Sequence, residues 1–204
     1  MFPFGCFTLG RLAEIAFGRN REVANRITAK ANAQQIGSAL FDFESTYGGL
    51  PDASTALLVK TKTGSTWALG DATSNDLFQQ LIASGICVSE DMFYTKTPWS
   101  RKPDNVFTTE TQALAAGECG FAYIAGLSYK DGPDTPLCVS PLEPGKLTFD
   151  REAFDGKAVI LRLDNSATLV PIDSTGHAIV NGMDLFDPRQ SFWHGKAPNV
   201  KWPK

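Results

Sequence analysis

The segment that decides the fold is NAQQIGSALFDFESTYGGLPD, residues 32–52. Its apolar positions recur three or four residues apart, which places them on one face of an α-helix. These positions are Ile36, Leu40, Phe43 and Tyr47. The pair Gly48-Gly49 can form a left-handed C-terminal cap, and Pro51 cannot continue a helix. The segment therefore predicts an amphipathic helix that packs on a core and ends at a tight turn.

The same segment also resembles one region of a known family. It is similar to the region just after the membrane helix in bacterial type IV prepilin-like proteins and type II secretion pseudopilins, in particular the prepilin-like proteins of planctomycetes and verrucomicrobia. Their pattern is Asn, two residues, Gln-Ile-Gly, one residue, Ala-Leu, and an aromatic run ending in Tyr-Gly and a Pro. In this chain the pattern falls on Asn32, Gln35, Ile36, Gly37, Ala39, Leu40, Tyr47, Gly48 and Pro51.

A strand pair near the C-terminal end is the second point of resemblance. The runs 157–163 and 166–172 are rich in apolar residues and flank Asp164-Asn165, a dipeptide that can supply a two-residue hairpin turn. Family members often end with a strand, an Asp-Gly-like turn and a return strand. Val159, Ile160, Leu161, Leu163 and Asp164 stand where that pattern places them, and Asn165 replaces the usual Gly.

These two matches predict an α+β fold with a long N-terminal helix on an antiparallel β-sheet. We expect one helix from about Glu22 to Tyr47, with Ile27, Ile36, Leu40 and Phe43 facing the core, and a sheet that includes 157–163 and 166–172. A second helix is expected within 71–85, capped around Ser74. Further strands are expected within the glycine- or proline-bounded runs 120–128, 137–142 and 177–183. Since no linker or repeat divides the chain, residues 22–204 are expected to form a single domain after an atypical segment 1–21.

The N-terminal segment, MFPFGCFTLGRLAEIAFGRNREVANR, matches the family only in part. Gly5 and Phe7-Thr8-Leu9 follow the prepilin order, but Cys6 intervenes and Glu14 comes later than the family's acidic residue. A membrane-spanning helix needs about 20 consecutive apolar residues, and charged residues interrupt this segment. Its basic residues follow the apolar ones, which is unlike a signal peptide. We therefore expect membrane association only with a longer native N-terminus. Cys6 is read as a small buried side chain, with a lipoprotein cysteine as the alternative.

The chain has four cysteines, at positions 6, 87, 119 and 138. Cys119 and Cys138 flank the expected strand 120–128 and the loop after it, and a disulfide between them would contribute about 3 kcal/mol. Pilins often carry a C-terminal disulfide, so the resemblance implies the same pairing. Two unpaired buried thiols are the alternative. Zinc is not expected, because the chain has no Cys-x-x-Cys motif and only two histidines.

The composition and motifs argue against several function classes. The net charge of −3 gives no electrostatic reason to expect nucleic acid as a partner. We find no nucleophile elbow and no glycine-rich phosphate loop, so no catalytic or cofactor-binding residue is expected. His177, Asp173, Asp184 and Ser174 are close in sequence, but residues 174–176 read as a turn. The chain is therefore predicted not to be an enzyme.

Calcium is the one cofactor that the resemblance raises. Major pseudopilins carry Ca²⁺ in a loop of their C-terminal region, and Asp131 and Asp134 make the candidate ligands here. Ca²⁺ takes six to eight oxygen ligands, and two carboxylates beside a proline do not define such a set. A solvated turn is the favoured reading.

The resemblance implies a non-enzymatic structural subunit of a type IV pilus or of a related type II secretion assembly. Its partners would be other pilin-like or secretion-system subunits, or further copies of itself, in the cell envelope or outside the cell. The alternative is a soluble or surface ligand-binding, adhesin-like module that kept the pilin-like head but lost the membrane helix. Candidate contact surfaces are the loop-rich segment 48–75, the 119–138 loop and the aromatic tail with Phe192, Trp193 and Trp202. The tail is expected to wrap back onto the sheet, with an exposed aromatic platform as the alternative.

Overall fold

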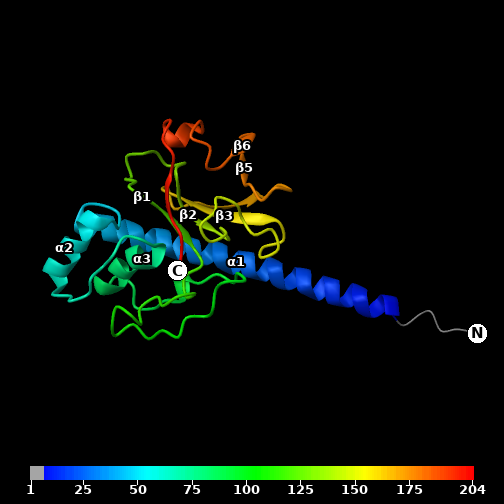
Figure 1. The fold of residues 1–204 in the computed structure, drawn as a ribbon, viewed down its shortest axis with the longest axis horizontal. Helices are drawn as coiled ribbons and strands as arrows, with labels where there is room; N and C mark the ends of the chain where they lie inside the picture. Colours follow the sequence, from blue (N-terminus) through cyan, green and yellow to red (C-terminus); the bar gives the residue numbers. More distant parts are fainter. Residues whose placement is uncertain (1–6) are drawn as a thin grey trace, which may run out of the picture.

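The longest element is helix α1, Phe7–Tyr47, which runs along the whole head of the molecule (Figure 1). The computed structural model describes the backbone of residues 7–204 and the side chains of residues 20–204. The helix begins before the expected Glu22 and ends at the expected place. The N–H of Gly48 donates to the carbonyl of Glu44, and Gly48 has a φ of +80°. The predicted glycine cap is thus confirmed.

One face of α1 is buried, as its periodicity predicts. Ala29, Ala33, Ile36, Leu40 and Phe43 are all completely inaccessible to solvent. The prediction that Ile27 faces the core is wrong, because 61% of its surface is exposed. Ile27 precedes Ile36 by nine residues, and about 100° of rotation per residue places the two on opposite sides of the helix.

Two shorter helices lie beside the C-terminal end of α1. Helix α2, Ala53–Thr63, was not predicted and occupies part of the segment expected to be loop-rich. Its N-terminus is closed by Asp52 and its C-terminus by Gly64, which has a φ of +72°. Helix α3, Ser74–Ala83, matches the helix expected within 71–85, although the capping residue is Thr73 and not Ser74. Two single-turn 3₁₀ helices, η1 and η2, span Asp91–Phe93 and Ser191–Trp193.

Five antiparallel strands form the main sheet, in the order β4-β3-β2-β1-β7. Their bounds are β1 Ala122–Ala125, β2 Pro136–Ser140, β3 Lys157–Arg162, β4 Ala167–Pro171 and β7 Asn199–Lys201. A separate two-stranded hairpin pairs β5, Ile179–Val180, with β6, Met183–Asp184. The predicted antiparallel pairing of 157–163 with 166–172 is confirmed. The sequence did not predict β7, through which the aromatic tail returns to pair with β1.

The turn between β3 and β4 differs from the two-residue turn expected at Asp164-Asn165. Leu161 pairs with Ala167, the N–H of Asn165 donates to the carbonyl of Arg162, and the N–H of Arg162 donates to the carbonyl of Ser166. Of the loop residues only Asn165 has a positive φ, +62°. These features define a three-residue loop, in which a tight turn is followed by one left-handed residue.

The sheet carries a buried cluster on each face, because side chains alternate along a strand. On one face Val159 and Leu161 of β3 pack with the buried stripe of α1. On the other face Ala158 and Ile160 pack with Leu185, Phe186 and Trp193. In Figure 1 the β5–β6 hairpin lies on the side of the sheet opposite α1. The fold is α+β, with a long N-terminal helix on an antiparallel sheet, as predicted.

Candidate functional site

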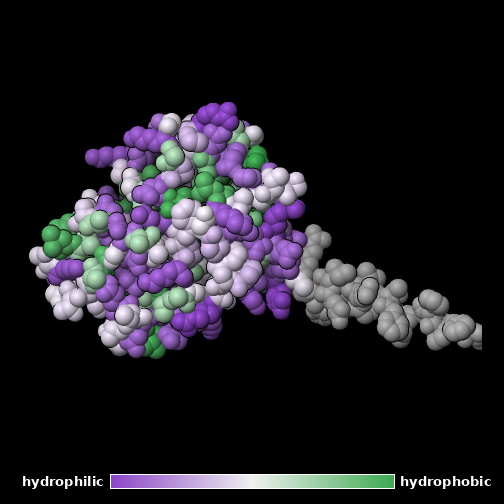
Figure 2. Space-filling view, in the orientation of Figure 1, coloured by the Kyte–Doolittle hydropathy of each residue, from purple (hydrophilic) through white to green (hydrophobic). Residues whose placement is uncertain are grey.

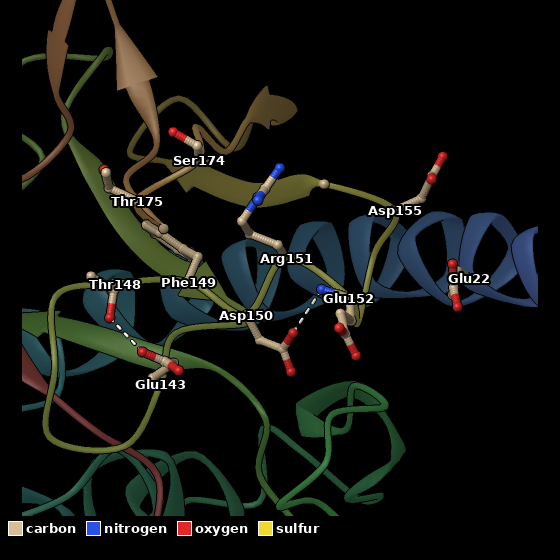
Figure 3. A pocket seen from close by; sticks show the side chains of 12 residues that line it. Glu22, Glu143, Thr148, Phe149, Asp150, Arg151, Glu152, Asp155, Ser174 and Thr175 are labelled. Carbon is tan, nitrogen blue, oxygen red and sulfur yellow. Dashed lines mark hydrogen bonds between the residues drawn. The ribbon is translucent and has the colours of Figure 1, made fainter.

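An open cleft of about 860 Å³ lies between α1, the loop before β3 and the turn after β4 (Figure 3). Its charged lining residues are mainly acidic, with Arg151 as the one basic side chain among the described lining residues. The carboxylates belong to Glu22, Glu143, Asp150, Glu152 and Asp155. The sequence did not single out this cleft, because its walls come from segments that are far apart in the chain.

Several of the cleft carboxylates are engaged within their own loops. Glu143 accepts a hydrogen bond from the hydroxyl of Thr148, and this bond lowers the pKa of Glu143. Asp150 accepts from the N–H of Glu152 at 2.7 Å (Figure 3). Asp155 pairs with Arg26 of α1 at 3.4 Å. These contacts give the carboxylates a role in shaping the loops and in fastening them to α1.

The four residues considered for catalysis at the sequence level do not form a nucleophile–base group. Nδ1 of His177 lies 2.5 Å from a carboxylate oxygen of Asp184. Asp173 instead accepts from the backbone N–H groups of Thr175 and His177, and so closes its own turn. Among the described residues, no hydroxyl or thiol is hydrogen-bonded to the His177 ring, and Ser174 is exposed in the turn. The absence of enzymatic activity stays a prediction.

The two calcium candidates are part of a turn. Asp131 accepts from the N–H of Ser128 at 2.6 Å and from its hydroxyl at 3.1 Å. Asp134 is exposed. In the described part of the chain, neither residue belongs to a group of three close carboxylates, imidazoles or thiols. Asp131 therefore closes a turn, and the absence of calcium at this turn stays a prediction.

Cys119 and Cys138 are completely buried free thiols in the structure, which is the second of the two alternatives that the sequence left open. Cys138 lies in β2, where it is paired with Tyr123 of β1, and Cys119 lies before β1. Burial raises the pKa of Cys119 to about 11. Cys6 lies outside the described residues.

The three aromatic residues of the tail are placed differently. Trp193 is only 4% exposed, and its indole N–H donates to the carbonyl of Leu185 at 2.7 Å. Phe192 and Trp202 are half-buried, and the Trp202 indole donates to the carbonyl of Lys146. The tail therefore wraps back onto the sheet, as preferred from the sequence, and Trp193 belongs to the core instead of a contact surface.

Helices α1 and α2 carry four of the eight large apolar side chains that are exposed among the described residues. Ile27 and Phe41 of α1 are 61% and 57% exposed, and Leu57 and Leu58 of α2 are 68% and 44% exposed. Figure 2 shows strongly apolar surface at the α2 end of the molecule. From the sequence, 48–75 is a candidate contact segment, but the sequence did not predict that helix α2 carries the exposed apolar residues of this segment.

Two further findings bear on function. Among the described helices, none combines the length and the hydropathy needed to span a bilayer. No family model, curated protein or solved structure matches the chain.

Proposed function

We propose that the protein is a non-enzymatic, pilin-like or pseudopilin-like structural subunit that acts by packing against other such subunits or its own copies, in the cell envelope or outside the cell. The supporting sequence pattern spans residues 32–52. These residues form the C-terminal half of α1 and its glycine-capped end, which is the position that the family pattern occupies.

The observation that carries the proposal is that α1 has one buried apolar face and, on its opposite side, two exposed apolar residues. One face packs on the sheet through Ile36, Leu40 and Phe43. Ile27 and Phe41 lie on the opposite side, both mostly exposed. Fourteen residues separate them, which corresponds to about 40° around the helix axis and about 21 Å along it. Gln34 and Ser38, which lie between them on this face, are polar and exposed. Ile27 and Phe41 are therefore two separate apolar contacts, which packing against another subunit would bury.

Self-association of the full chain tests this proposal. Sedimentation velocity over a range of concentrations is expected to show a concentration-dependent increase in mass for the wild-type chain. The double variant Ile27→Ser/Phe41→Ser is expected to weaken that association without a large change in melting temperature. Val88→Ser is the matched control, because Val88 is an exposed apolar residue, 79% accessible, outside the helices. Equal association by all three chains would contradict the role of these two residues.

A ligand-binding, adhesin-like module is the second candidate function, and the open cleft of Figure 3 favours it. An acidic cleft of this size is suited to a basic or cationic ligand. A wild-type chain that stays monomeric at every concentration and binds a basic peptide would favour this second function. Salt should then weaken the binding, since exposed charges are screened.

A further inference from the structure

Three carboxylates that are far apart in sequence meet in the segment between α3 and β1. Glu90 begins the turn of η1, Asp104 lies in the following loop, and Glu118 lies just before β1. One ligating oxygen from each residue lies within 4.8 Å of those from the other two. Oxygens that share a Ca²⁺ ion lie about 2.3–2.6 Å from it, so two of them can be at most about 5 Å apart. The spacing of the three oxygens therefore fits one cation.

Glu90 supplies the second observation that points to a ligand. Its side chain is completely buried, and Oε1 accepts the backbone N–H of Leu114. Its other oxygen, Oε2, is buried and has no hydrogen-bond partner. Burying a carboxylate oxygen without a hydrogen-bond partner lowers the stability of the folded state. In this protein the oxygen belongs to the Glu90 carboxylate, which lies close to those of Asp104 and Glu118. Burial, with those two neighbouring carboxylates, raises the pKa of Glu90.

Glu118 is also completely buried. Its Oε2 accepts the backbone N–H of Ala115 at 2.9 Å, and its Oε1 lies 2.9 Å from Nη1 of Arg101 without forming an aligned hydrogen bond. The Arg101 side chain is 54% exposed. Three ionised carboxylates beside one guanidinium leave two negative charges uncompensated, and a divalent cation would balance them.

We propose that Glu90, Asp104 and Glu118 bind a hard divalent cation, for which Ca²⁺ is the best fit. Carboxylate oxygen is the donor type that such cations prefer, and the donor set contains no thiol or imidazole. Asp104 is exposed, so water can enter from its side and complete the six to eight ligands of Ca²⁺. The site is separate from Asp131 and Asp134, which lie in the connection between β1 and β2.

The bound cation would fasten residues 84–121, a long connection whose only helical element is η1. This segment is already attached to α1, because the Asn32 side chain donates to the carbonyls of Asp91 and Tyr94. A cation bound by Glu90, Asp104 and Glu118 would join the start, middle and end of this segment. It would thereby stabilise the part of the fold in which the segment packs against α1 and α3. Binding to the folded state alone raises stability by mass action.

The experiment uses the full chain after chelator treatment and dialysis, with CaCl₂ and MgCl₂ in separate titrations. Calorimetry is expected to show saturable 1:1 binding of Ca²⁺, and the melting temperature should rise with its concentration. Asp104→Asn should weaken the affinity by about tenfold, because it removes one charged ligand. Glu90→Gln should abolish the response while keeping an acceptor for Leu114. Asp131→Asn is the matched control and should bind as the wild type does.

Two results would overturn the proposal. The first is a wild-type chain that shows neither binding heat nor a change in melting temperature with Ca²⁺ or with Mg²⁺. Protonation, and not a bound cation, would then neutralise the Glu90 carboxylate. The other is an undiminished response in Asp104→Asn, which stays informative if Glu90→Gln fails to fold, since Asp104 is exposed. A response to Mg²⁺ but not Ca²⁺ would overturn the choice of Ca²⁺.

Discussion

Gly37 determines how closely α1 can approach the β3–β4 turn. A Cβ atom at this position would lie 2.1 Å from Oδ1 of Asn165 and 3.2 Å from Cδ1 of Leu161. Asn165 also donates from its side chain to the hydroxyl of Ser38 at 3.1 Å. The glycine of the sequence pattern thus has a physical role, because it lets the helix backbone touch the hairpin turn.

Replacing Gly37 with alanine is expected to lower the free energy of unfolding by about 1–2 kcal/mol, as overpacking does. The steric cost should exceed the gain of about 1 kcal/mol in helix propensity. The double variant Gly37→Ala/Asn165→Gly should recover most of the loss, because glycine removes Oδ1 and tolerates the positive φ. Urea denaturation of both variants measures the effect, and an unchanged or higher stability for Gly37→Ala would contradict it.

At the scale of elements, the bounds of helix α2 are set by its capping residues and not by the spacing of its apolar residues. The Asp52 carboxylate accepts from the N–H groups of Ser54 and Thr55, and the Thr55 hydroxyl accepts from the N–H of Asp52. Burial raises the pKa of Asp52, but the hydrogen bonds from Ser54 and Thr55 outweigh it, so the pKa is lowered overall. The cap therefore works best when the carboxyl is ionised.

We expect Asp52→Ala to cost about 1 kcal/mol near neutral pH, the usual value of an N-cap. A carboxyl with a lowered folded-state pKa stabilises the fold above its unfolded pKa of about 3.9, and loses this contribution as pH falls through the folded value. The difference between wild type and Asp52→Ala should therefore shrink as pH falls below the unfolded pKa, and disappear once the carboxyl of the folded state is also protonated. Urea denaturation at several pH values measures it. Asp52→Asn keeps an acceptor, so its difference from the wild type should be smaller near neutral pH and should also shrink as pH falls, because the wild-type carboxyl is the group that titrates.

The two faces of α1 are expected to differ sharply in their sensitivity to mutation. Phe43 is completely buried and stacks on Tyr47 with ring centroids 4.5 Å apart. Phe43→Ala should cost about 3–5 kcal/mol, whereas Ile27→Ala on the exposed face should change stability by less than about 0.5 kcal/mol. Thermal and chemical unfolding of the two variants check this. Similar costs at both positions would mean that α1 is packed on both sides within one chain.

At the scale of the whole molecule, three cysteines lie in the buried core. Cys87 is 2% exposed, and Cys119 and Cys138 are not exposed at all. Burial, with the nearby Asp42 carboxylate, raises the pKa of Cys87 to about 12, and burial raises that of Cys138 as well. Thiols that are both inaccessible and protonated react slowly, since the thiolate is the nucleophile.

We expect all three thiols to stay unmodified when the native protein is treated with iodoacetamide at pH 8. In denaturant without reductant, all three should be labelled, and peptide mass spectrometry assigns each site. If Cys119 and Cys138 resist labelling in denaturant until a reductant is added, they form the disulfide that the pilin resemblance implies. Labelling of either residue in the native state would contradict the packing of the core.

The sequence by itself determined the buried stripe of α1, its glycine-capped end and the antiparallel β3–β4 pair. These features follow from spacing along one segment and from the conformations that Gly, Pro and Asn allow, so they can be read without knowing the neighbours. Only the tertiary structure decided that the tail becomes β7, that Cys119 and Cys138 are buried as free thiols, and that Glu90, Asp104 and Glu118 converge. Each of these depends on how distant segments pack, because a strand edge or a buried carboxylate gains its partner only when the chain closes around it.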